Sequence, residues 1–255
     1  MEFYMLLDEV KATLAIENLI LSPEQEKLLK DYADGVISFE ELKSLIFKLL
    51  KENRAAWILE ASTFDEVYCY KNSEILKNNF NETDPQILSQ YERLFTGARL
   101  VDLIKKPLEG NFDLNHLKKI HHYIFQDVYP WAGELRRVNI SKEILFCDVN
   151  YIQPEIEKIF EKLKAENYLR NLPKDQVYKR AAYYLGEINA IHPFREGNGR
   201  AQREFIRELL IPLGLHVDYS LCSPEMMLHA SIESFAGDYH LMEDLFFKCI
   251  KTIKQ

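Results

Sequence analysis

The stretch HPFREGNGRAQR, His192–Arg203, decides how the rest of this sequence is interpreted. Pro193 disfavours helix at the residue before it, so the preceding helix should end near Ala190. Apolar residues return at helical spacing after the stretch, at Phe205, Ile206, Leu209 and Leu210. The segment Glu196–Gly199 should therefore form a tight loop that leads into the N-terminus of a second helix.

Two glycines and a row of arginines make this loop a candidate anion site. Gly197 and Gly199 let the backbone come close to a ligand and turn its N–H groups outward. Arg200, Arg203 and Arg207 share one helical face, and two of them fall in the first turn, where the helix dipole disfavours cations. Because a guanidinium group pairs with phosphate through two hydrogen bonds at once, a bound polyphosphate explains their placement.

His192 and Glu196 add reactive groups beside the loop. A neutral histidine can take a proton from an attacking hydroxyl near pH 7, and a carboxylate beside phosphates can hold Mg²⁺. A zinc site is disfavoured, since Pro193 and the loop disrupt the helical geometry of an HExxH motif. A P-loop is disfavoured too, since no Gly-Lys-Ser/Thr follows. Together these residues are the parts for group transfer from a nucleoside triphosphate.

Composition places the chain among ordinary globular proteins. Of its 255 residues 47% are hydrophobic and 28% charged, and only 9 Gly and 9 Pro interrupt it, which favours long helices. The net charge of −8 argues against broad binding to nucleic acid. The four cysteines form no CxxC pair, the first residues lack the basic region of a signal peptide, and no apolar run reaches membrane-spanning length. We expect a cytoplasmic protein without direct membrane or nucleic-acid partners.

The first sixty residues predict three helices. One apolar face of the first is marked by Leu6, Val10 and Leu14. The motifs SPEQ at Ser22–Gln25 and SFEE at Ser38–Glu41 are both typical of capping boxes that begin a helix. The second helix should end near Gly35, and the third should continue to about Ala61. No glycine-rich linker follows, so this segment should be docked on the remainder of the chain.

The body of the chain is predicted to be mainly α-helical with one β-hairpin. Helical signals cover Pro85–Lys105, Leu114–Gln126, Pro154–Asn167 and Pro173–Ala190, with more after Pro224. The segment RRVNISKEILFC, Arg136–Cys147, is rich in β-branched and aromatic residues around a polar centre and predicts a small hairpin. His121 and His122 fall inside a predicted helix without Cys or Asp at metal-binding spacing, so we interpret them as structural.

HPFREGNGRAQR matches the signature of the Fic family, His-Pro-Phe-x-Asp/Glu-Gly-Asn-Gly-Arg-x-x-Arg, at every defined position. The resemblance extends over about Tyr68–Phe247 and includes LKNNFNETDPQILSQYE and YPWAGELRRVNISK. It implies a helical core with a β-hairpin flap over the site. It also implies transfer of AMP from ATP and Mg²⁺ to a Ser, Thr or Tyr hydroxyl of another protein.

The resemblance also assigns roles to single residues. It makes His192 the base and Glu196 the magnesium ligand. For the triphosphate it assigns Gly197, Asn198 and Gly199 to the α- and β-phosphates, Arg200 to charge neutralisation and Arg203 to the γ-phosphate. The flap residues that align a target segment would be Ile140, Ser141 and Lys142. Glu143 stands where many members have Gly, and Trp131 where Phe is common, so the target does not follow from the resemblance.

The N-terminal helices resemble the small VbhA-like antitoxins that silence Fic toxins. The stretch TLAIEN fits their inhibitory pattern Ser/Thr-x-x-x-Glu-Gly/Asn through Thr13, Glu17 and Asn18. Four residues of spacing predicts that Thr13 and Glu17 lie on one helical face. By the resemblance Glu17 pairs with Arg203 and blocks productive ATP binding. The expected organisation is antitoxin-like helices over residues 1–62 and a Fic domain over residues 63–255.

Three alternatives to an autoinhibited adenylyltransferase stay open at this point. Some family members remove AMP with the inhibitory glutamate, which would make Glu17 catalytic. Another donor, such as CDP-choline, would change the transferred group. A non-catalytic toxin–antitoxin interaction module would need no base at His192. Protein substrates expected from the resemblance are gyrase or topoisomerase IV subunits, together with the chain itself by self-AMPylation.

Overall fold

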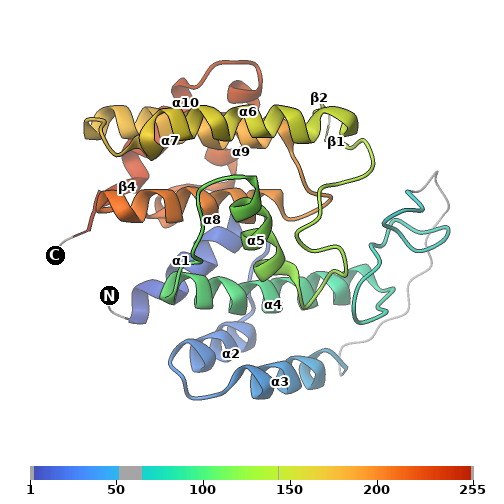
Figure 1. The fold of residues 1–255 in the computed structure, drawn as a ribbon. Coiled ribbons are helices and arrows are strands. Elements are labelled where there is room, and N and C mark those ends of the chain that lie inside the picture. The colour runs from blue at the N-terminus through green and yellow to red at the C-terminus, as the bar shows by residue number, and fades with distance from the viewer. Residues whose placement is uncertain (1–2, 52–64, 143, 254–255) are drawn as a thin grey trace.

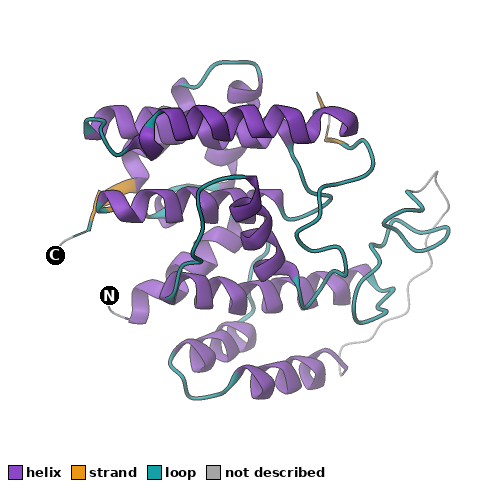
Figure 2. Ribbon diagram, in the orientation of Figure 1, coloured by secondary structure: helices purple, strands orange, loops and turns teal. Residues whose placement is uncertain are grey.

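The chain folds almost entirely into α-helices (Figures 1 and 2). A computed structural model describes residues 3–51, 65–142 and 144–253. The helices of this part are α1 Phe3–Ala15, α2 Pro23–Ala33, α3 Phe39–Lys51, α4 Pro85–Lys105, α5 Leu114–Phe125, α6 Ile152–Ala165, α7 Lys174–Ile191, α8 Asn198–Leu210, α9 Pro224–Phe235 and α10 His240–Cys249. The predicted mainly α fold is confirmed, and the predicted helices of the body end within two residues of the observed ones.

The predicted starts of α2 and α3 are confirmed by their capping contacts. The Ser22 hydroxyl accepts from the Gln25 N–H at 3.3 Å, and the Gln25 side chain accepts from the Ser22 N–H at 3.0 Å. Ser38 and Glu41 repeat the arrangement at 3.3 and 2.8 Å. Both helices thus satisfy N–H groups that a helix N-terminus leaves without partners. The predicted continuation of α3 to Ala61 lies outside the described residues, as does the expected domain boundary at 62.

Two small antiparallel sheets accompany the helices. Strands β1 Ser141–Lys142 and β2 Ile144–Leu145 pair with each other, which confirms the predicted hairpin. Strands β3 Leu215–Val217 and β4 Ile250–Thr252 also pair, and this sheet was not predicted from the sequence. Each strand has only three residues and its partner is far along the chain, so no local alternation or turn signal marks it. Short 3₁₀ turns lie at Val149–Tyr151, Asn167–Leu169, Ile211–Leu213 and Tyr219–Leu221.

Helix α8 lies at the centre of the fold, with α1, α5 and α7 packed against it. All of its residues except Gly199 are buried. Figure 1 shows α2 and α3 along α4, on the side opposite α7 and α10. The apolar residues of α1 belong to the same continuous core as those of α8, so the N-terminal helices are docked as predicted. No helix of the described residues is long and apolar enough to cross a membrane.

A buried carboxyl group lies where α1 meets α8. Glu9 of α1 is 8% exposed, and burial raises its pKa to about 7. The groups facing it are Arg207, which lowers the pKa, Glu204 and Asp218, which raise it, and His216, whose Nε2 lies 3.3 Å from Glu9 Oε1. Folded Glu9 therefore keeps a proton that the unfolded chain releases near the ordinary value of 4.5.

Docking of α1 should accordingly weaken as the pH rises. Because folded Glu9 binds the extra proton, its contribution is present below pH 4.5 and is lost as the pH rises through about 7. The variant Glu9→Gln cannot lose that proton. We expect the free energy of unfolding of this variant, measured in urea from pH 5 to 8, to increase relative to that of the wild type as the pH rises. The exposed Glu24→Gln is the control for the substitution itself, and a pH-independent offset for Glu9→Gln would contradict the assignment.

Candidate active site

A cleft of about 1010 Å³ opens above the N-terminus of α8. Its walls come from the turn after α1, from α4, from α9 and from the hairpin. The predicted residues His192, Glu196, Gly199, Arg200 and Arg203 all line it. Segments that are far apart in the sequence therefore meet at the loop between α7 and α8.

The conformation of the loop between α7 and α8 is set by two left-handed residues and by hydrogen bonds to its backbone. His192 ends α7 in the left-handed conformation, with φ 51°, and Gly197 precedes α8 with φ 76°. The buried Asn198 side chain accepts from the Phe194 N–H and donates to the Phe194 carbonyl, both at 2.8 Å. The Asn198 side chain therefore holds the loop closed, and what it can offer a phosphate is its backbone N–H at the helix start.

His121 of α5 supports this loop from below. Its ring stacks on Phe194 with centroids 3.9 Å apart, its Nδ1 accepts from the Gly133 N–H at 2.8 Å, and its Nε2 donates to the Glu196 carbonyl at 2.9 Å. Burial lowers the pKa of His121 to about 3, so the ring is neutral. The structural interpretation of His121 is confirmed, although its partner Glu196 could not be inferred from the helix pattern.

Arg200 is a buried cation held between carboxylates. Its Nη2 lies 2.5 Å from Glu92 Oε1 of α4, its Nη1 donates to the Thr96 hydroxyl at 3.1 Å, and its Nε lies 2.7 Å from Glu17 Oε2. The hydroxyl of Tyr129 donates to the other oxygen of Glu92. Burial alone would lower the pKa of Arg200. The neighbouring carboxylates, of which Glu17 has the largest effect, raise that pKa by more than burial lowers it, so the group stays charged.

Glu17 also reaches the second arginine of the motif. Arg203 Nη2 donates to Glu17 Oε1 at 2.7 Å and to the Thr13 carbonyl at 3.0 Å. A Cβ atom added to Gly199 would lie 2.6 Å from the same Glu17 oxygen. The carboxylate thus sits directly over the first turn of α8, where the helix dipole favours a negative charge.

A helix-end motif after α1 directs the Glu17 side chain toward Arg200 and Arg203. The Leu19 N–H donates to the Leu14 carbonyl at 3.1 Å and the Asn18 N–H to the Ala15 carbonyl at 2.8 Å, the two hydrogen bonds of a Schellman motif. The motif needs a left-handed residue, and Asn18 supplies it with φ 58°. This explains physically why Gly or Asn follows the glutamate, since those residues enter that conformation at least cost.

Two details predicted from residue spacing are wrong. Thr13 and Glu17 do not share one face of a helix, because α1 ends at Ala15 and Glu17 lies in the turn that follows. Thr13 instead meets Arg203 through its backbone carbonyl. Arg207 does not join Arg200 and Arg203 at the cleft, because its buried guanidinium donates to the carboxylate of Glu204 at 2.6 and 2.8 Å.

His192 and the hairpin meet at the far side of the cleft. The ring of Phe146, which follows β2, stacks on the His192 ring with centroids 4.0 Å apart and an interplanar angle of 17°. The Phe146 N–H donates to the carbonyl of Ile140 at 3.3 Å across the hairpin. Of the other predicted docking residues, the backbone of Ser141 and Lys142 forms β1, which lies beside this contact.

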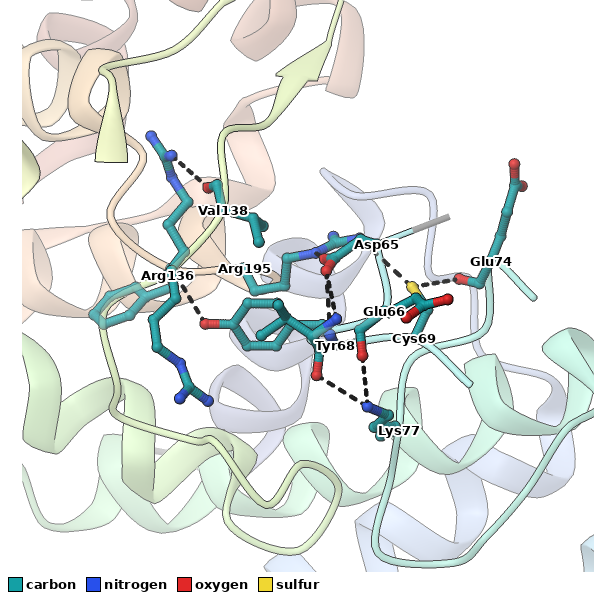
Figure 3. Close-up of polar contacts among 12 residues, drawn as sticks. Asp65, Glu66, Tyr68, Cys69, Glu74, Lys77, Arg136, Val138 and Arg195 are labelled. Atoms are coloured by element: carbon teal, nitrogen blue, oxygen red, sulfur yellow. Dashed lines mark hydrogen bonds and ion pairs between the residues drawn. The ribbon is translucent and has the colours of Figure 1, made fainter. Parts of the chain in front are cut away.

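A tether joins the loop to the segment before α4. The guanidinium of Arg195 donates to Asp65 at 3.1 Å, and Lys77 donates to the carbonyls of Glu66 and Val67 at 2.8 and 3.1 Å (Figure 3). The contacts of Asp65 with Arg195 and of Glu92 with Arg200 were not predicted, because no local sequence pattern marks either carboxylate. Glu92 is the last residue of the family-like stretch LKNNFNETDPQILSQYE.

Comparison with known proteins shows the family of this chain. The Fic/DOC family matches residues 111–210. The probable protein adenylyltransferase y4lH of Sinorhizobium fredii is 38% identical over 176 residues, which are 68% of this chain and 90% of that protein. The chain belongs to the Fic family. The predicted family and enzyme class are thereby confirmed.

Two further similarities concern Bartonella proteins. Protein adenylyltransferase VbhT of Bartonella schoenbuchensis is 39% identical over 182 residues, which span 71% of this chain and only 38% of VbhT. The crystal structure of the effector BepC of Bartonella tribocorum, with bound AMPPNP, superimposes with a TM-score of 0.69 at 28% identity, covering 74% of this chain and 99% of that one. The predicted ATP-type ligand is consistent with the nucleotide that BepC holds.

Glu196 fits the Mg²⁺ ion that the Fic resemblance implies. Its half-buried carboxylate lines the cleft beside Gly199 and Arg200, and one oxygen accepts from the Gly197 N–H at 2.8 Å. Within residues 3–51, 65–142 and 144–253, no group of three or more His, Cys, Asp or Glu side chains is arranged so that it could hold a metal ion by itself. Mg²⁺ does not require one, since it is commonly held by one or two carboxylates, phosphate oxygens and water.

Gly197 of the Fic motif should tolerate no side chain. A Cβ atom there would lie 2.0 Å from Cζ of the fully buried Phe125, whereas one on Gly214, also at positive φ, would meet nothing within 4 Å. Gly214→Ala should cost about 1–2 kcal/mol of stability from its left-handed backbone. Gly197→Ala should cost about 1–3 kcal/mol more from overpacking. Urea unfolding of both variants measures the difference, and equal costs would contradict the close packing of the loop on Phe125.

Proposed function

We propose that this Fic protein transfers AMP from ATP to a hydroxyl of a target protein and that its own N-terminus keeps the activity low. The observation that carries the proposal is the Glu17 carboxylate, whose two oxygens lie 2.7 Å from Arg200 and 2.7 Å from Arg203. These are the two motif arginines that the triphosphate would need. Glu17 therefore competes with the terminal phosphates for the same cations.

The charges of the cluster support this competition. Arg200 and Arg203 carry two positive charges, and Glu17 and Glu92 carry two negative charges, so the contacting group is neutral with Glu17 in place. Without Glu17 the contacting side chains carry one net positive charge, offset in part by the nearby Glu196 carboxylate, in a largely buried setting that favours binding of a phosphate oxygen. Glu92 would keep Arg200 in position in either state.

The energetics support low basal activity. Holding activity near one percent needs a bias of about 2.7 kcal/mol. Leu6, Val10 and Leu14 anchor α1 with exposures of 7%, 0% and 0%, and burial of each such side chain contributes about 1.5–3 kcal/mol before entropy is counted. Because Glu17 belongs to the same chain as the site, dilution cannot separate it from the arginines.

The chemistry follows from where the groups lie. A target hydroxyl would attack the α-phosphorus in line, its oxygen forming the new P–O bond while the bond to the β-phosphate oxygen breaks and pyrophosphate leaves. His192 would accept the hydroxyl proton. The N–H groups of the first turn of α8 would hold the phosphates, with Arg200 and Arg203 neutralising them. Mg²⁺, when bound at Glu196, would supply further neutralisation of the developing charge.

Glu17→Gly should release the activity. With purified protein, labelled ATP and a bacterial lysate, we expect labelling of a target or of the chain itself to rise at least tenfold over the wild type. Asp8→Ala, on the exposed side of α1, is the matched control and should leave labelling at the wild-type level. The double variant Glu17→Gly, His192→Ala should be silent while keeping the melting temperature of its parent.

The same experiment separates the rival functions. Unchanged labelling in Glu17→Gly would contradict inhibition by Glu17, and labelling that survives His192→Ala would contradict the base. Loss of AMP from a labelled substrate that requires Glu17 would instead support AMP removal. Labelling of the target by another labelled nucleotide, with none from labelled ATP, would indicate a different donor.

A further inference from the structure

A single buried arginine outside the motif holds the backbone around His192. Arg136 is 2% exposed and precedes the hairpin. Its backbone N–H donates to the Pro193 carbonyl at 2.9 Å, its Nε to the His192 carbonyl at 2.8 Å, and its Nη2 to the Ile191 carbonyl at 3.3 Å. Three successive carbonyl groups centred on the proposed base are thus bound by one residue.

The same guanidinium also binds both limbs of the hairpin. Its Nη1 donates to the Val138 carbonyl at 2.8 Å, which Figure 3 shows, and its Nη2 donates to the Cys147 carbonyl beyond β2. Val138 and Cys147 lie on opposite sides of β1 and β2, and Phe146 between them stacks on the His192 ring. Arg136 therefore fixes the base and the flap relative to each other.

A purely structural role would account for only part of this arrangement. A cation at the end of α7 satisfies carbonyls that the helix leaves unpaired and complements its dipole, and many arginines do no more. Here the bound end is His192, a non-glycine residue at φ 51°, a strained conformation that persists only where neighbours impose it. The guanidinium fork meets four carbonyls in different directions, which the single nitrogen of lysine cannot do.

We infer that Arg136 is a positioning residue for AMP transfer, which sets the His192 ring and the flap in the geometry that the attacking hydroxyl requires. This inference rests on the proposed function. The side-chain hydrogen bonds of Arg136 go to the backbone around His192 and to the hairpin, away from the first turns of α8, so nucleotide binding at α8 should not depend on it. Loss of Arg136 should lower kcat and leave ATP binding intact.

The test compares Arg136→Lys and Arg136→Ala, both in the Glu17→Gly protein. We expect kcat for self-labelling or target labelling to fall at least tenfold in each, while KM for ATP changes less than threefold and calorimetry still finds one ATP per chain. Guanidinium ion at millimolar concentration should restore part of the activity of Arg136→Ala, and methylammonium should not. The exposed neighbour Arg137→Lys is the matched control and should keep the kcat of its parent.

Full kcat in Arg136→Lys would overturn the inference, as would a loss of ATP stoichiometry that parallels the loss of activity, because the residue would then only maintain the fold. If the Glu17→Gly parent is itself inactive, the proposed function fails, and the inference is judged by NMR of histidine-labelled protein. There the His192 ring signals should shift in Arg136→Lys and not in Arg137→Lys. Unshifted signals would overturn the placement of His192 by Arg136.

Discussion

The structure depends above all on the pairing of one carboxylate with two guanidinium groups over a helix N-terminus. Glu17 comes from the turn after α1, whereas Arg200 and Arg203 lie in the first two turns of α8, about 185 residues further along the chain. The ion pairs are formed where burial strengthens them, and Glu92 holds the opposite side of Arg200. In the proposed function the same cations would bind the triphosphate, so one interaction would both stabilise docking of the N-terminus and close the site.

Neighbouring residues hold Glu17, Arg200 and Arg203 in position. Asn198 and His121 hold the loop before α8 through its backbone, and the Schellman motif at Asn18 aims Glu17. Arg136 does the same for His192 and the hairpin. The reactive side chains are thus positioned mainly through hydrogen bonds to their backbone. The residues that make these hydrogen bonds have no proposed role in the reaction itself. Such support is expected where groups must be placed to within fractions of an ångström.

Much of the fold could be predicted from the sequence, because its helices carry strong local signals. Capping boxes at Ser22 and Ser38 and a proline after Asp84 fixed helix starts to the residue. The motif loop was predicted because its glycines and arginines are unusual at a helix start. Local signals say nothing about partners distant in the chain, and so the β3–β4 pairing, the Glu92 contact to Arg200 and the Arg136 clamp were not predicted. Spacing also misplaced Glu17, since the helix ends before it at Ala15.

Calorimetric titration of ATP and AMP into the wild type and the Glu17→Gly variant, with Mg²⁺ present, tests the central claim most directly. If Glu17 occupies the place of the terminal phosphates, its removal should strengthen ATP binding at least tenfold, about 1.4 kcal/mol, while AMP binding changes less than threefold. An equal change for both nucleotides, or none for ATP, would contradict the competition between Glu17 and the triphosphate for Arg200 and Arg203.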